Sequence, residues 1–123
     1  NLMAVSLLNH NQIKEFTDTT KGLNLIAVYI ADSYGALQPK NIKDIFSNPN
    51  LNGIHTHDNM GLAFANCLEA INSGATYIDG TLTGMGRGVG NVTTEQLILH
   101  CSKTNINDKL LEVREEFLTM KSV

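Results

Sequence analysis

Short apolar stretches alternate with amphipathic ones four times along this chain, and that alternation constrains the fold more than any other feature. The apolar stretches begin near Leu2, Leu25, Leu51 and Ala75, and their spacing of about 25 residues suits a strand, a loop and a helix. Continuous apolar strands are typical of parallel sheets that are buried on both faces. The sequence therefore predicts an α/β fold in which helices cover parallel strands.

The amphipathic stretches carry the signals of helix ends. Gly22 and Gly74 stand where a helix is expected to stop, Pro39 suits a first helical turn, and Thr93 with Gln96 has capping-box spacing. We expect the first two strands over residues 2–8 and 25–31, and helices over residues 11–22, from 39, over 62–74, from 94 and over 108–120.

The size of the chain suggests how these units are completed. Four strand-helix units are half of an eight-stranded TIM barrel, which typically needs about 250 residues. We therefore expect residues 1–123 to form a single partial domain, the C-terminal half of such a barrel. The abrupt start at Asn1, without an initiator methionine, is what a fragment would show. An open flavodoxin-like sheet is the alternative fold.

Composition excludes several classes of function. The net charge of -3 leaves no basic face for nucleic acid, and no aromatic platform is present for stacking bases. No apolar run approaches the roughly 20 residues that a bilayer span requires. The chain is expected to be cytoplasmic, with no nucleic-acid or membrane partner. Cys67 and Cys101 lack metal-binding spacing, and both are predicted to be reduced thiols in the core.

The most informative motif is Gly53-Ile54-His55-Thr56-His57-Asp58-Asn59, at the end of an apolar run. Side chains two residues apart in a strand point the same way, so His55 and His57 can hold one metal ion. The same alternation also arises on an exposed strand without any ligand. The junction of strand and loop favours ligation, because active sites of parallel α/β folds lie at that end.

A glycine-rich segment, Gly84-Met85-Gly86-Arg87-Gly88-Val89-Gly90-Asn91, follows the next apolar run. It does not fit GxGxxG, because the sixth positions from Gly84 and Gly86 are Val89 and Asn91. No Gly-Lys-Ser/Thr follows for a phosphate loop. Ser33 lacks the glycine-flanked elbow of a hydrolase nucleophile. The segment is therefore expected to act as a tight loop that closes over the two histidines.

Together these motifs resemble the metal-dependent aldolases and acyl-condensing enzymes of the HMG-CoA-lyase-like, or pyruvate carboxyltransferase, superfamily. The resemblance rests on residues 55–63, on Gly84–Asn91 with Thr94 and Glu95, and on Asp32-Ser33-Tyr34-Gly35 as a strand end. It implies that His55 and His57 bind a divalent ion, Mn²⁺ or Mg²⁺, with Asn91 as a further ligand. The acidic ligand of such enzymes belongs to a first strand that this chain does not contain, so the site as given is incomplete.

The resemblance also implies a substrate loop and catalytic residues. Gly86, Gly88 and Gly90 would let the backbone approach a 2-oxo acid closely, and Arg87 could pair with the substrate carboxylate. A solvated arginine at a loop tip is the alternative for Arg87. Ser33, at the strand end, is the other candidate catalytic residue.

Departures from subfamily patterns narrow the activity. Biotin-dependent carboxyltransferases carry a metal-bridging lysine where this chain has Ala31, and HMG-CoA lyases carry a loop cysteine that residues 83–91 lack. The glycine segment is closer to the 4-hydroxy-2-oxovalerate aldolase type than to isopropylmalate or homocitrate synthases. We expect an aldolase that releases pyruvate and an aldehyde. The alternatives are an acetyl-CoA-dependent Claisen-type synthase and an inactive half-barrel, which could pair with a second copy through its sheet edges.

Overall fold

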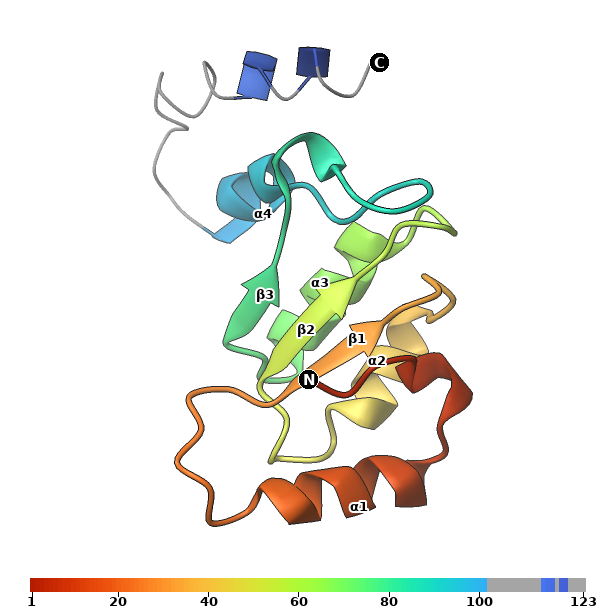
Figure 1. The fold of residues 1–123 in the computed structure, drawn as a ribbon, viewed down its shortest axis with the longest axis vertical. Coiled ribbons are helices and arrows are strands. Elements are labelled where there is room, and N and C mark those ends of the chain that lie inside the picture. Colours follow the sequence, from red (N-terminus) through yellow and green to blue (C-terminus); the bar gives the residue numbers. More distant parts are fainter. Residues whose placement is uncertain (102–113, 117, 120–123) are drawn as a thin grey trace.

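The computed structural model describes residues 1–101, 114–116 and 118–119. Figure 1 shows the order of its elements. The helices and strands are α1 (His10–Thr20), β1 (Tyr29–Asp32), α2 (Pro39–Ile45), β2 (Gly53–Thr56), α3 (Ala63–Asn72), β3 (Tyr77–Asp79) and α4 (Thr94–Cys101), with 3-10 turns at Val5–Leu7 and Leu82–Gly84. The helix expected over residues 108–120 lies mostly outside the described residues.

The three strands form one parallel sheet in the order β1-β2-β3. Ala31 pairs with His55, and His55 pairs with Asp79, so these three residues form one row across the sheet. Helices α2 and α3 are the connections between successive strands, as in repeated strand-helix units. The predicted α/β fold with parallel strands is therefore confirmed.

The expected first strand over residues 2–8 is wrong beyond its first residues. Leu2 pairs with β1, since its N–H donates to Tyr29 and its carbonyl accepts from Ala31, both at 2.8 Å. Ala4 then adopts a left-handed conformation with φ 51°, and its N–H donates to the Ser33 hydroxyl at 2.8 Å. This hydrogen bond to a side chain replaces the next rung of the sheet. The chain turns into a 3-10 helix that buries Val5.

The second strand is also shorter than expected. It begins at Tyr29, and the apolar residues before it face solvent, with Leu25 51% and Ile26 82% exposed. Hydrophobicity predicts a strand from residue 25, whereas the sheet pairs only the last residues of the run. None of the helices in the described part of the chain has the length and apolar character that a bilayer span requires.

The helix-end signals are matched by the structure. Gly22 (φ 80°) and Gly74 (φ 102°) adopt the left-handed conformation just after α1 and α3, where a side chain would be strained. Pro39 opens α2, and the Thr93 hydroxyl accepts a hydrogen bond from the Gln96 N–H at 3.2 Å at the start of α4.

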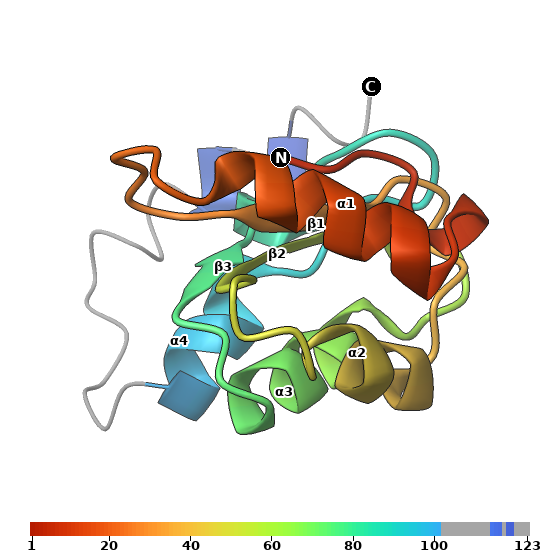
Figure 2. The same ribbon diagram turned by 90° about the horizontal axis from the view of Figure 1, so that it is seen from below.

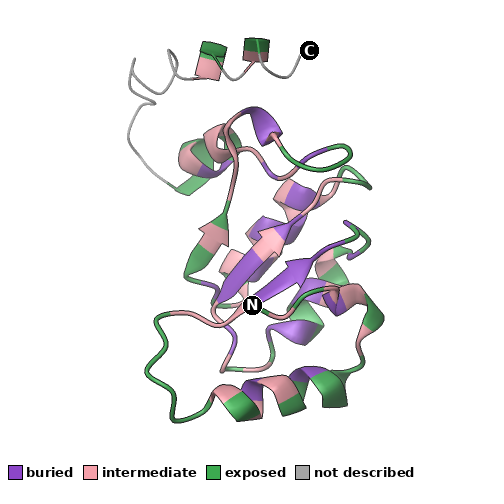
Figure 3. Cartoon of the chain, in the orientation of Figure 1, coloured by how far each residue is buried: buried purple, intermediate pink, exposed green. Residues whose placement is uncertain are grey.

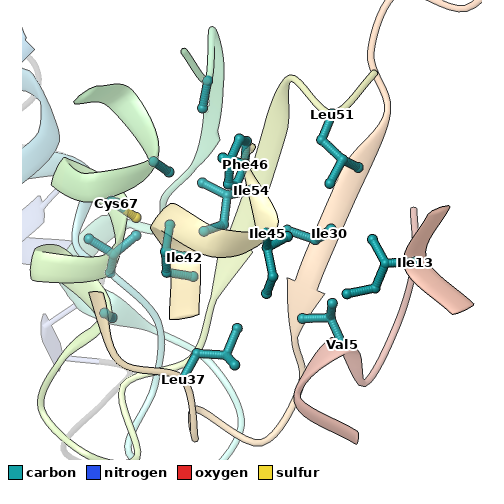
Figure 4. Packing of buried hydrophobic residues seen from close by; sticks show 14 of the residues in the cluster. Val5, Ile13, Ile30, Leu37, Ile42, Ile45, Phe46, Leu51, Ile54 and Cys67 are labelled. Carbon is teal, nitrogen blue, oxygen red and sulfur yellow. The ribbon is translucent and has the colours of Figure 1, made fainter. Parts of the chain in front are cut away.

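The core lies between the sheet and helices α2 and α3, which both cover one face of it (Figure 2). Ile30 and Ile54 point from the strands into this layer and are fully buried, as are Ile42 of α2 and Cys67 of α3 (Figure 4). Figure 3 shows that buried residues concentrate on β1, β2 and parts of these helices, whereas β3 is exposed or intermediate. Because strand side chains alternate, residues 29, 31, 53, 55, 77 and 79 occupy the opposite face.

Candidate metal centre and substrate loop

The loops that follow the three strands meet at the carboxyl ends of the sheet. The Arg87 guanidinium donates to the carbonyl oxygen of Ser33 at 2.6 Å, which joins the glycine segment to the end of β1. The Asp58 N–H donates to the Gly90 carbonyl at 2.8 Å, which joins it to the end of β2. The structure thus brings together the segments that carry Ser33, His57, Arg87 and Gly90, as the sequence predicted.

His57 is held by the backbone of β1. Its Nδ1 lies 3.0 Å from the carbonyl oxygen of Asp32. A carbonyl oxygen can only accept, so Nδ1 is the donor in this contact, and in the neutral ring the lone pair is then on Nε2. A backbone carbonyl bound to Nδ1 is a common way to orient a metal-ligating histidine.

His55 lies beside His57 with a different neighbour. The two ring centroids are 5.0 Å apart and the ring planes are nearly perpendicular, at 84°. Nδ1 of His55 is 3.4 Å from Oδ2 of Asp79 on β3, and the His55 side chain is 25% exposed. The two imidazoles therefore share one region, and each has its Nδ1 turned toward an oxygen.

Asn91 lies on the segment opposite His57. It forms an isolated bridge with His57, and its side-chain N–H donates weakly to the Met85 carbonyl at 3.4 Å. Its Oδ1 is buried and accepts no hydrogen bond within the part of the chain that the structure describes. A buried amide oxygen without a donor is uncommon, and a cation would satisfy it. Imidazole nitrogens and an amide oxygen are atom types that divalent ions accept as ligands.

The described residues contain no group of three or more His, Cys, Asp or Glu side chains that could hold a metal. An amide oxygen and two histidines are a neutral ligand set, whereas Mn²⁺ and Mg²⁺ usually take at least one carboxylate. These three described residues supply no carboxylate to an ion.

The glycine segment is shaped by left-handed turns and close contacts. Thr83 (φ 57°) and Gly84 (φ 69°) turn the chain, and Glu95 of α4 accepts the Thr83 N–H through both carboxylate oxygens, at 3.0 and 3.2 Å. A Cβ on Gly86 would lie 2.7 Å from Oδ1 of Asn91, and one on Gly90 would overlap the Gly84 carbonyl. Glycine at these positions leaves room for the Asn91 amide and for the tight return of the loop.

The candidate catalytic residues have distinct surroundings. Arg87 is exposed, but its bond to the Ser33 carbonyl holds it over the strand ends. The Ser33 hydroxyl accepts from the Ala4 N–H. Asp32 is fully buried, and its carboxylate accepts from the N–H groups of Ala36 and Leu37, both at 3.0 Å, so it shapes the turn after β1.

Asp79 is the site residue that the sequence analysis missed. In the sequence it lies within an apolar run, yet it stands in register with His55 on the same face of the sheet. Strand alternation and the parallel register together would have found it. The prediction for Cys101 was wrong, because this thiol is exposed, whereas Cys67 is buried as expected. Burial raises the pKa of the Cys67 thiol to about 11.

The sequence matches the HMGL-like family over residues 2–115. A 4-hydroxy-2-oxovalerate aldolase of Carboxydothermus hydrogenoformans is 41% identical over 77% of this chain and 31% of its own length. A Thermus thermophilus protein of the same name is 37% identical over 77% of this chain and 30% of its own length. The chain therefore spans about a third of the length of these curated relatives.

Solved structures show the same fold. An HMG-CoA lyase from Acinetobacter baumannii, solved with coenzyme A and 3-methylmalate, has a TM-score of 0.72 and 26% identity, over 87% of this chain and 41% of that one. The carboxyl transferase domain of Rhizobium etli pyruvate carboxylase has a TM-score of 0.67 and 19% identity, over 85% of this chain and 20% of that one. These neighbours are TIM-barrel enzymes, which favours the barrel over the flavodoxin-like alternative.

Proposed function

Because the chain belongs to the HMGL-like family, we propose that it forms part of a divalent-metal-dependent aldolase. The reaction is cleavage of a 4-hydroxy-2-oxo acid to pyruvate and an aldehyde, which the names of the curated relatives support. The observation that carries the proposal is the buried Oδ1 of Asn91, which accepts no hydrogen bond from the described residues and belongs to a residue whose backbone bridges to His57. We further propose that the sheet is the C-terminal half of the barrel.

The residues that would hold the ion are His55 and His57, through Nε2, and Asn91, through Oδ1. A bound Mn²⁺ or Mg²⁺ would supply Lewis-acid stabilisation of the negative charge that develops when the carbon-carbon bond beside a ketone breaks. Neutral ligands leave the charge of the ion largely undiminished, which favours this chemistry. A carboxylate ligand and the general base are expected from elsewhere in the barrel.

Arg87 and the glycine segment would bind the substrate. A guanidinium has five N–H donors, and the Ser33 carbonyl accepts from one nitrogen of Arg87, so donors remain for a substrate carboxylate. Because the bond to the Ser33 carbonyl already restrains Arg87, its side chain would lose less conformational freedom when the substrate binds. Gly86 and Gly88 are exposed and carry no side chain that would block a 2-oxo acid. Ser33 supports this arrangement through its backbone carbonyl and its bond to Ala4.

The test is a pyruvate-release assay on the complete protein that carries this sequence, with 4-hydroxy-2-oxovalerate as substrate and Mn²⁺ or Mg²⁺ supplied. We expect metal-dependent turnover. His55→Ala and His57→Ala should each reduce kcat/KM at least 100-fold, because loss of a residue that only orients a metal ligand already costs up to about 100-fold. His10→Ala, which replaces an exposed histidine of α1, is the matched control.

The same preparation distinguishes the alternatives. Thiol release from acetyl-CoA in the presence of a 2-oxo acid would indicate a Claisen-type synthase. Absence of both activities, with metal bound, would contradict the aldolase proposal and support the alternative of an inactive half-barrel. Undiminished turnover in His55→Ala would contradict the assignment of the ligands. Association between copies of the chain is a separate proposal, which a monomeric mass in solution would exclude.

A further inference from the structure

Three polar side chains lie on the face of the sheet that α2 and α3 do not cover. Tyr29 of β1, His55 of β2 and Asp79 of β3 all belong to the set of alternating positions on this face. His55 and Asp79 are paired in register on neighbouring strands, and their Nδ1 and Oδ2 atoms are 3.4 Å apart. Tyr29 stands one row lower, two strands away from Asp79.

Gly53 lets Tyr29 span that distance. Tyr29 pairs with Gly53, and a Cβ on this glycine would lie 2.6 to 2.7 Å from three carbons of the tyrosine ring. The ring therefore lies over β2, in the space that a side chain would fill. On the far side it meets Tyr77 of β3, with the two ring centroids 6.4 Å apart. Only glycine at position 53 allows Tyr29 to reach across the middle strand.

Asp79 connects the two residues. Burial raises the pKa of Tyr29 first, and then the negative charge of Asp79 and a hydrogen bond between the two side chains raise it further. The tyrosine hydroxyl stays protonated and donates, while the carboxylate accepts. The Asp79 carboxylate therefore interacts with two groups, the Tyr29 hydroxyl and Nδ1 of His55. The Asp79 side chain is 49% exposed, so its contact with Tyr29 limits the orientations that it can adopt.

We propose that Asp79, oriented by Tyr29 across Gly53, is a positioning residue that keeps the His55 proton on Nδ1 and leaves Nε2 available as a ligand. The inference rests on the proposed function, because it names what prepares one of the proposed ligands. The two histidines differ in this respect. His57 is held by the backbone carbonyl of Asp32, which no side-chain substitution removes, whereas His55 depends on a side chain.

The first readout is the tautomer of each histidine, which does not require metal or activity. Two-bond ¹⁵N–¹H correlation spectra of the metal-free protein, at a pH where imidazoles are neutral, show which ring nitrogen carries the proton. We expect the Nδ1–H form for His55 and His57 in the unmodified protein. In Asp79→Ala, His55 should lose that preference, while His57 keeps it. Asp79→Asn retains an acceptor oxygen and should retain most of the preference.

The second readout is the dissociation constant for Mn²⁺. Loss of a group that orients a metal ligand typically weakens metal binding 10- to 100-fold, which we expect for Asp79→Ala. Tyr29→Phe removes one hydrogen bond and should weaken binding by about fivefold. Gly53→Ala, which displaces the Tyr29 ring, should match Tyr29→Phe.

An unchanged His55 tautomer in Asp79→Ala, or an Nε2–H form in the unmodified protein, would overturn the inference. A tautomer change without any Mn²⁺ binding by the unmodified protein would support the role of Asp79 but contradict the proposed metal site. His57 serves as the internal control in every spectrum, because a general loss of structure would alter both rings.

Discussion

Gly86→Ala should weaken metal binding without unfolding the protein. The added Cβ would lie 2.7 Å from Oδ1 of Asn91 and 2.8 Å from both Cγ and Nδ2, so the whole amide stands in its way. Ordinary contacts begin near 3.5 Å, so the amide must retreat by about 1 Å. Displacements of that size at a working site can reduce function by about 100-fold, so we expect Mn²⁺ binding to weaken 10- to 100-fold.

The fold itself should tolerate this change. Gly86 does not have a positive φ, so alanine fits its backbone, and reduced freedom of the unfolded chain contributes about 0.4 to 1 kcal/mol of stability. We therefore expect the free energy of unfolding, measured by urea titration, to change by less than about 1 kcal/mol. A large loss of stability would mean that the clash spreads beyond Asn91.

A double-mutant cycle isolates the mechanism. Asn91→Ala removes the amide that the new methyl group would displace, so adding Gly86→Ala to it should weaken Mn²⁺ binding by less than about twofold further. Isothermal titration calorimetry of the four proteins measures the coupling. Full affinity in Gly86→Ala, or losses that simply add in the double variant, would refute the role assigned to Asn91.

Three further changes test other parts of the account. Ile54→Ala, in the fully buried centre of the sheet, should lower the free energy of unfolding by about 2 to 5 kcal/mol in urea titrations. A loss below about 1 kcal/mol would contradict the packing of Ile54 in the core. With a thiol reagent at pH 8, Cys101 should react rapidly and Cys67 only on unfolding. Because burial raises the pKa of Cys67 from 9.0 to about 11, stability should decline as the pH rises through that interval, and decline less in Cys67→Ala. Arg87→Met should raise KM for the 2-oxo acid about tenfold or more with Mn²⁺ affinity unchanged, and an unchanged KM would favour a solvated arginine.

Much of the architecture could be predicted from local patterns. Apolar periodicity located three of the four expected strands, and Gly22, Gly74, Pro39 and Thr93 marked helix ends because their conformational preferences act locally. The first strand could not be predicted in the same way. It ends after Leu2 because a distant hydroxyl, that of Ser33, binds the backbone of the next turn, and no local pattern encodes that contact.

In the candidate site, too, some residues could be predicted from local sequence patterns and others depend on long-range contacts. His55 and His57 could be found from strand alternation, and the glycine segment from its composition. The partner of His57 is a backbone carbonyl, which carries no residue-specific signal. Asp79 required the register of two strands, and the position of the Asn91 oxygen required the path of the loop. Contacts that depend on register or loop path appear only in the folded chain.

A Mn²⁺ titration of the protein tests the proposed metal centre most directly. The His55→Ala, His57→Ala double variant and the His10→Ala control are titrated alongside. We expect saturable binding that His10→Ala leaves unchanged and the double variant loses. Binding of equal strength in all three proteins would place the ion elsewhere and contradict the metal centre at the ends of the strands.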